Sequence, residues 1–435
     1  MKLLKSLLLG SAAGLAAVMG AQAADLPVAK AAPVDYVRVC STYGSGFWYI
    51  PGTETCLRVG GRVRADYLYG EPLTRAQDAI GFRARGRLNI DTRTATAYGL
   101  LRAYIRYELT RSSGTPFSLG GTGVGSGAAT STNLAQAFVQ FGGLTAGRVT
   151  SFFSNADLPT GHMGTIRFDD APDVNTLAYT FSFGNGFSAT LALEDGLDRR
   201  SGINNLFTAA PGLYAGQRVP DVVANVKYVG TWGGAQLSGA VHQIRSNNLL
   251  VIDPVTGLAD FPDTEYGWAI SGTAHVNLPM LAPGDALWVA ATYADGAPAY
   301  LNGGLAGTVI SPFAAFENGT PTLVDATIDP ITGEFERSRA WSIAGGLRHY
   351  WTPQIRSNIF GSYLDSDSRV SVRTPADFRE WRVGANVFWQ PVSGLDLGVE
   401  VIYANTNLRG VDPVTSLGFR DSQGWEGRFR VQRDF

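Results

Sequence analysis

The chain has 435 residues, and its 35 lysines and arginines nearly balance its 37 aspartates and glutamates, giving a net charge of −2 at pH 7. That balance lacks the strong net positive charge typical of nucleic-acid-binding proteins and so gives no argument for a nucleic-acid partner. The 53 glycines, the 11% of aromatic residues and the mean hydropathy of +0.01 leave open a membrane barrel, because a barrel strand is apolar on one face only.

The N-terminus has the pattern of a cleavable export signal. Lys2 and Lys5 precede a short apolar run, and Ala21-Gln22-Ala23 supplies the small residues of a cleavage site. We predict a signal peptide over 1–23 and a mature chain that starts at Ala24, with net charge −4. The alternative, a membrane anchor, is disfavoured because the run is short. No later stretch has the roughly 18 consecutive apolar residues that a spanning helix needs.

Residues 24–55 form a separate N-terminal lead-in, of which 24–35 is a small-residue linker with two prolines. Its Cys40 and the following Cys56 are the two cysteines of the chain. An exported chain favours their pairing, and a disulfide there contributes about 3 kcal/mol in the loop-entropy model. The alternative, a metal site, lacks nearby histidines, so we expect neither a metal nor another cofactor.

From Cys56 onward the sequence alternates with the period of two that marks β-strands. Over 57–69, 81–93, 99–109 and 424–435, one face is apolar and aromatic and the other is charged. The first three of these segments share nine arginines on the charged face: Arg58, Arg62, Arg64, Arg83, Arg85, Arg87, Arg93, Arg102 and Arg106. Neighbouring carboxylates, Asp66, Asp91 and Glu108, are suited to hold the guanidinium forks.

The arginine face must be in contact with water. Burying nine guanidinium groups with few carboxylates costs several kcal/mol for each group. The apolar face is therefore the covered one, either against lipid or against a second sheet. Alternation by itself leaves a soluble sandwich open.

The lengths of the connections favour the membrane barrel. Further strands are predicted near 133–141, 144–151, 174–183, 187–194, 221–231, 235–245, 264–278, 286–294, 339–351, 354–364, 379–390 and 394–404, which makes sixteen in all. Short turns (DTRT, GG, GNG, WGG, PMLAPG, TP, PVSG) alternate with long loops that start near 70, 110, 152, 195, 246, 295, 365 and 405. Short turns at one end and long loops at the other are typical of an antiparallel outer-membrane β-barrel.

Aromatic residues recur near the predicted strand ends, as in the interfacial girdles of such barrels. The alternative for any one of them is a place in a protein core. The set is Tyr67, Tyr69, Trp268, Tyr293, Trp341, Trp351, Trp381, Trp389, Tyr403 and Trp425.

The third long loop, 152–173, has four aspartates: Asp157, Asp169, Asp170 and Asp173. If this loop folds into the barrel, its acids face the arginine wall across a narrow opening. The alternative is a solvated acidic surface loop, and charge alone does not decide between the two.

Several segments resemble the alphaproteobacterial general porins of Brucella and the rhizobia. They are VRVC, FWYIPGTETCLRVGGRVRADY, AQAFVQFGGLTAGRVTSFF and the terminal aromatic strand. The resemblance covers essentially the whole mature chain. It implies a sixteen-stranded barrel over 56–435, a homotrimer in the outer membrane among lipid and lipopolysaccharide, and passive diffusion of small hydrophilic solutes and ions.

The resemblance also implies that the third loop forms the constriction. The acidic candidates are the four aspartates above, and the facing cluster is drawn from Arg62, Arg64, Arg83, Arg85, Arg102, Arg106 and Arg148. The second long loop, 114–132, corresponds to the family's inter-subunit latch; it is glycine-rich and uncharged. A channel selective for a sugar or an anion is the alternative within this class.

Two other classes fit less well. An outer-membrane enzyme needs a catalytic motif, and none of the four histidines, His162, His242, His275 and His349, lies in one. An adhesin or receptor role for loops 195–219 and 295–338 is compatible with a porin. We expect no enzymatic activity and no nucleic-acid partner.

Overall fold

The computed structural model describes residues 38–72, 75, 77–117, 128–207, 211–252, 259–302, 322–370, 374, 376–409 and 421–435. The predicted signal peptide, the linker 24–35, and parts of the loops 114–132, 195–219 and 295–338 lie outside these residues. Among the described residues, no helix is both long and apolar enough to cross a bilayer.

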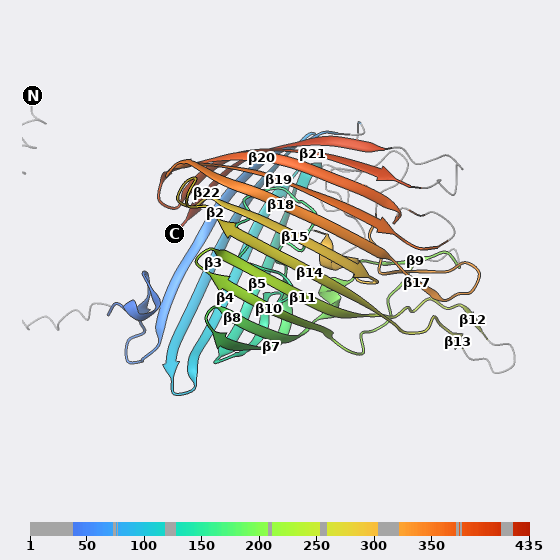
Figure 1. The fold of residues 1–435 in the computed structure, drawn as a ribbon, viewed down its shortest axis with the longest axis horizontal. Coiled ribbons are helices and arrows are strands. Elements are labelled where there is room, and N and C mark those ends of the chain that lie inside the picture. Colours follow the sequence, from blue (N-terminus) through green and yellow to red (C-terminus); the bar gives the residue numbers. More distant parts are fainter. Residues whose placement is uncertain are drawn as a thin grey trace, which may run out of the picture.

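Sixteen antiparallel strands of the described chain close into a barrel (Figure 1). Closure comes from β2 and β22, which pair from Arg62 opposite Asp434 to Gly70 opposite Glu426. The barrel strands are β2 (Cys56–Gly70), β3 (Ile80–Thr96), β4 (Gly99–Ser113), β5 (Ala128–Phe141), β6 (Leu144–Thr150), β7 (Asp173–Gly184), β8 (Phe187–Glu194), β10 (Asp221–Gly230), β11 (Gly233–Ile244), β14 (Glu265–Asn277), β15 (Ala286–Asp295), β18 (Arg339–Thr352), β19 (Ile355–Asp367), β20 (Phe378–Val392), β21 (Leu395–Leu408) and β22 (Ser422–Asp434). The predicted count is confirmed.

Short and long connections alternate around the barrel as predicted, with one turn displaced. The DTRT segment is not a turn, because β3 continues to Thr96 and the chain reverses at 97–98. The extended part of β3 is paired on both sides: the backbone of Arg93 lies opposite Cys56 of β2 and opposite Arg102 of β4. Gly99, at φ 111°, supplies the left-handed conformation that ends the turn.

The outer surface of the barrel is apolar. Val63, Leu191, Leu237 and Val399 are each more than half exposed and lie on the outward rows of four different strands. The predicted girdle tryptophans lie on this surface too; Trp268, Trp341 and Trp381 are more than 40% exposed. Such a surface needs hydrocarbon around it.

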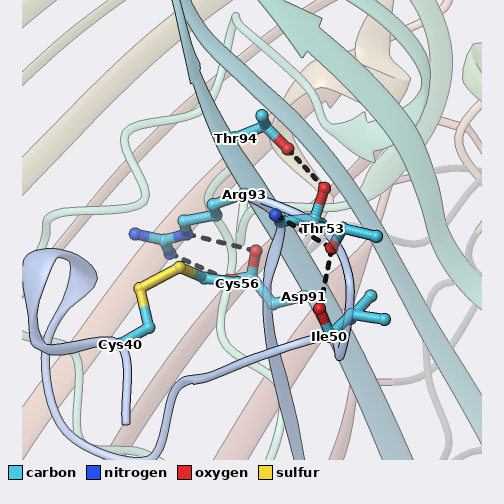
Figure 2. Close-up of a disulfide and its surroundings, with 8 residues drawn as sticks. Cys40, Ile50, Thr53, Cys56, Asp91, Arg93 and Thr94 are labelled. Atoms are coloured by element: carbon cyan, nitrogen blue, oxygen red, sulfur yellow. Dashed lines mark hydrogen bonds and ion pairs between the residues drawn. A yellow bond between two sulfur atoms is a disulfide. The ribbon is translucent and has the colours of Figure 1, made fainter. Parts of the chain in front are cut away.

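The lead-in takes over the pairing of β2 beyond the end of β22. Gly61 of β2 exchanges backbone hydrogen bonds with the terminal residue Phe435. Nearer the start of β2, on the same edge, the short strand β1 (Trp48–Tyr49) pairs with Cys56 and Leu57. Figure 2 shows the Cys40–Cys56 disulfide beside this hairpin, with Arg93 bound to Asp91 next to it. The predicted disulfide is confirmed.

Small elements lie in the long loops. A three-stranded sheet joins β9 (Ile203–Asn205), β16 (Ala326–Ile328) and β17 (Phe335–Arg337), and β12 (Val251–Ile252) pairs with β13 (Ala259–Asp260). Short 3-10 helices are η2 (Ser41–Tyr43), η3 (Thr115–Phe117), η4 (Gly196–Arg199) and η5 (Pro298–Leu301). The long loops therefore pack on one another at one end of the barrel.

Candidate pore constriction

The segment between β6 and β7, residues 151–172, is called loop 3 here, and it runs along the inside of the barrel. Its first turns bind the middle strands: Asn225 of β10 donates to the Phe152 carbonyl at 2.6 Å, and Asn155 donates to Thr273 of β14 at 2.9 Å. Its tip, at Met163 and Gly164, reaches β21 and β22. A segment that contacts strands this far apart around a closed cylinder must lie within it. The predicted inward fold of loop 3 is confirmed.

Charged side chains of the wall bind the backbone at the tip. The Glu400 carboxylate accepts from the Met163 and Gly164 N–H groups, both at 2.6 Å, and Arg428 donates to the Met163 carbonyl at 2.6 Å. A Cβ at position 164 would lie 2.5 Å from Ile402 Cδ1 and 2.8 Å from Glu426 Oε1, so a larger residue would require these side chains to shift. These contacts also identify the inner face of β22, on which Arg428 and Arg430 alternate with the lipid-facing Phe429.

A buried ion-pair cluster fixes the returning half of loop 3. Arg167 and Arg382 both donate to Glu380, with Nε to Oε1 distances of 2.5 and 2.7 Å, and all three side chains are fully buried. Burial is the main cause that lowers the pKa of Arg167, to about 10, and Arg382 adds to the effect while Glu380 opposes it. The guanidinium therefore stays charged at neutral pH.

The underside of loop 3 is apolar. Leu158, Ile166 and Phe168 pack on the wall residues Trp288, Ala290, Ala344, Phe360 and Ile402. Ile166 is completely buried. Apolar contact and ion pairs together hold the loop against the strands from β15 to β21, on the side of the barrel away from the arginine-rich inner face of β2–β4.

The four predicted loop acids are not brought into contact with the predicted arginines. Asp157 pairs with Lys227 of β10 at 2.5 Å, and Asp173 accepts from Gln136 at 2.6 Å. Asp170 lies 3.8 Å from His162 and keeps a side chain 39% exposed. Asp169 is buried and bound by Ser154 and by Arg199 of η4, whose Nη1 lies 2.6 Å away.

The arginines of β2–β4 line the inner wall, and their carboxylate partners are the ones named from the sequence. Asp66 binds Arg83 at 2.6 Å, Glu108 binds Arg87 at 2.5 Å, and Asp91 binds both Arg93 and Arg102 within 3.0 Å. Asp66 also binds Arg430 of β22 at 2.6 Å. The interior is thus polar and charged, as the arginine count requires.

Arg148 lies apart from that wall. Its Cα partners are Ala137 and Asn175, and its guanidinium binds Asp198 of η4 at 2.9 Å. The structure places the other six predicted arginines, Arg62, Arg64, Arg83, Arg85, Arg102 and Arg106, on the inner faces of β2–β4.

The residues that anchor loop 3 escaped the sequence reasoning. Glu380, Arg382 and Glu400 occupy inward positions on β20 and β21, each next to an outward apolar residue. This alternation predicts that the three charged side chains face the lumen, but it does not predict that they bind loop 3.

The chain matches known proteins along nearly its whole length. Residues 25–427 match the model of a family described as the porin subfamily. The chain belongs to this porin subfamily. Porin Omp2b of Brucella suis is 30% identical over 447 residues, spanning 99% of this chain and all of that protein, and Porin Omp2b of Brucella canis is 29% identical over 99% of each.

Solved structures confirm the porin fold. The outer membrane channel DcaP of Acinetobacter baumannii has a TM-score of 0.60 at 16% identity, covering 89% of this chain and 99% of that one. The anion-selective porin from Comamonas acidovorans has a TM-score of 0.52 at 12% identity, covering 88% of this chain and all of the other. This porin is therefore a multi-pass β-barrel of the outer membrane, and its family membership indicates a channel rather than an enzyme.

Proposed function

We propose that this porin lets small hydrophilic solutes and ions diffuse passively through a pore narrowed by loop 3. The observation that carries the proposal is the position of loop 3, which is bound to the inner wall from β10 to β22 and faces the arginines of β2–β4. Rigid anchoring by Glu380 and Glu400 keeps the opening at a fixed width.

The eyelet would be formed by Arg62, Arg64, Arg83, Arg85, Arg102 and Arg106 on one side and loop 3 on the other. Of the loop acids, Asp170 has a side chain that is 39% exposed and is the one able to act on a passing solute, because Asp157, although 46% exposed, is bound to Lys227. Asp169 and Asp173 serve instead to hold the loop, through Arg199 and Gln136.

Planar-bilayer recording of the purified protein tests this proposal. Stepwise conductance increments that scale with bulk salt conductivity are expected. Swelling of proteoliposomes in sugars of increasing size should show a sharp cut-off. Absence of channel steps from correctly folded protein would refute diffusion through this pore.

We also propose a homotrimer, with β3–β5 at the contact between copies. At the end of the barrel that carries the long loops, strands β14–β22 have outward-facing aromatic residues such as Trp268, Trp341 and Trp381. Strands β4 and β5 have none at that level. There the outward positions are small or polar: Arg111, Ser113, Ala128, Thr130 and Thr132. Such residues suit a protein contact better than a lipid interface. Sedimentation in detergent should give three chains per particle, and a monomer would contradict the proposal.

Finally, we propose that residues 1–23 are removed during export and that the lead-in 24–55 stays on the mature chain. N-terminal sequencing of protein from outer membranes should begin at Ala24. A sequence beginning at Met1 would contradict it.

A further inference from the structure

The inner wall of β22, β2, β3 and β4 has a large excess of positive charge. Alternation and register place five carboxylates there, Asp66, Asp91, Glu108, Glu426 and Asp434. The same rows have eleven arginines: Arg58, Arg62, Arg64, Arg83, Arg85, Arg87, Arg93, Arg102, Arg106, Arg428 and Arg430. The wall therefore cannot be neutralised by its own carboxylates.

The arginines lie directly opposite one another. Arg64 is the cross-strand partner of Arg85, and Arg62 is the partner of Arg87. Like charges in directly opposed positions destabilise a sheet. A chain that needed only a wet wall could use serine, threonine or asparagine there, as β19 and β20 do at Asn358, Ser362 and Asn386.

Three of these guanidinium groups have mainly neutral partners. Arg64 donates to the Gln432 amide oxygen at 3.0 Å. Arg85 donates to the Thr110 hydroxyl at 2.9 Å and reaches Glu108, which Arg87 already binds, only at 3.4 Å. Arg106 contacts the Tyr104 hydroxyl at 3.4 Å, and its buried Nε has no partner among the described residues. Each group keeps N–H donors for a further acceptor.

Loop 3 offsets little of this positive charge. Asp157 is bound to Lys227 on β10, Asp169 to the buried Arg199 and Asp173 to Gln136, which leaves Asp170, beside His162, against an excess of six arginines. Burial opposes the charge on Arg199, but Asp169, Tyr300 and Glu194 together outweigh it and raise the pKa of Arg199, so its guanidinium stays charged. Glu400 and Glu380 are bound to the loop itself and to Arg382.

The spacing suits transfer from one arginine to the next. Arg64 and Arg85 are directly opposite each other on β2 and β3, which places their Cβ atoms about 5 Å apart, and Arg83 and Arg87 flank Arg85 at about 7 Å along β3. These distances are within the screening length of about 8 Å at physiological salt, so an anion leaving Arg64 or Arg85 is already attracted by a neighbouring group. Arg106 lies on β4 opposite Asn89, four residues along β3 from Arg85. The guanidinium fork matches the oxygens of phosphate and carboxylate groups.

We propose that Arg64, Arg85 and Arg106 form a row of transient binding sites for small oxyanions, inorganic phosphate and carboxylates among them, which makes this porin prefer anions over cations. This inference rests on the proposed function, since it assigns a substrate class to the same pore.

Reversal potentials in a KCl gradient test the preference. The native trimer in a planar bilayer should reverse towards the chloride equilibrium potential. The double variant Arg64→Gln/Arg85→Gln should lower the chloride-to-potassium permeability ratio at least about threefold. Arg433→Gln is the control: it removes one guanidinium charge from the outward row of β22 and should leave the ratio unchanged.

Inorganic phosphate probes the binding sites directly. Added phosphate should reduce the chloride current of the native protein with a saturating dose dependence, and Arg106→Gln should weaken that block severalfold. Channels that conduct but reverse towards potassium, or a ratio unmoved in the double variant, overturn the anion inference and leave the diffusion pore intact. Absence of any channel steps refutes the pore itself. Resistance of each variant to SDS before heating shows that the barrel has folded.

Discussion

Glu380→Gln should release loop 3 from the wall. Glu380 is fully buried and is the carboxylate that Arg167 of loop 3 and Arg382 of β20 share. The glutamine has nearly the same shape, but it removes the negative charge and leaves two buried guanidinium groups close together.

The structure sets the size of the effect. Leaving one member of a buried ion pair without its partner costs about 3–5 kcal/mol. Because each 1.4 kcal/mol is a factor of ten, the equilibrium between bound and released loop shifts by roughly two to four orders of magnitude. The Glu400 contacts and the apolar underside still hold the tip, so we expect the segment around Arg167 to detach while the barrel stays closed.

Two assays detect the release. Single-channel recordings should show larger and noisier open currents than the native protein. A small arginine-specific reagent such as phenylglyoxal should modify Arg167 in the folded variant, whereas this side chain is inaccessible in the native protein. Arg379→Gln is the control: Arg379 is the neighbouring residue on β20, and it faces outward and binds Asp365 with its side chain 54% exposed. A Glu380→Gln barrel with native noise and an Arg167 still protected from the reagent would refute the role given to this cluster.

Two further predictions concern the fold. Cys40→Ser/Cys56→Ser should lower the stability of the lead-in by about 3 kcal/mol, because the disulfide closes a loop over a separation of 16 residues. A thiol reagent should find no free thiol in the native sequence when it is unfolded without reduction. A reactive thiol there would reject the pairing. Leu237→Arg on the outward face of β11 should destabilise the membrane-inserted barrel by about 2–4 kcal/mol, measured by urea unfolding in lipid vesicles. The same change at Leu249, an exposed loop residue, should have little effect, and equal stabilities would argue against a lipid-facing β11.

The wall of the barrel could be predicted from sequence because its information is local. Because Arg83, Arg85 and Arg87 are alternate residues of one strand, they share one face, and that face must be the one in contact with water. Their carboxylate partners lie directly opposite on the neighbouring strands, Asp66 opposite Arg83 and Glu108 opposite Arg87. The local pattern also predicted the sixteen strands. It misplaced the turn after β3, because Asp91 and Arg93 were assigned to the turn, whereas in the structure they form ion pairs within the strand pairing.

The interior contacts of loop 3 could not be predicted in the same way. Arg167 and Glu380 are 213 residues apart, and Asp169 meets Arg199 only because η4 packs against the base of loop 3. The family resemblance implied that the loop acids face the arginine wall, whereas the docked loop binds Asp157 to Lys227 and Asp169 to Arg199. Which charges remain available to a solute is decided by tertiary packing.

The central claim is that the guanidinium-lined face of the sheet holds water and the other face does not. Cysteines placed singly at two adjacent positions of β2 test it: Arg64→Cys on the inner row and Val63→Cys on the outer row, each treated with a charged, membrane-impermeant thiol reagent during bilayer recording. We expect the reagent to reduce the current through the Arg64→Cys channel and to leave the Val63→Cys channel unchanged. Modification of Val63→Cys with no effect at Arg64→Cys would contradict the claim.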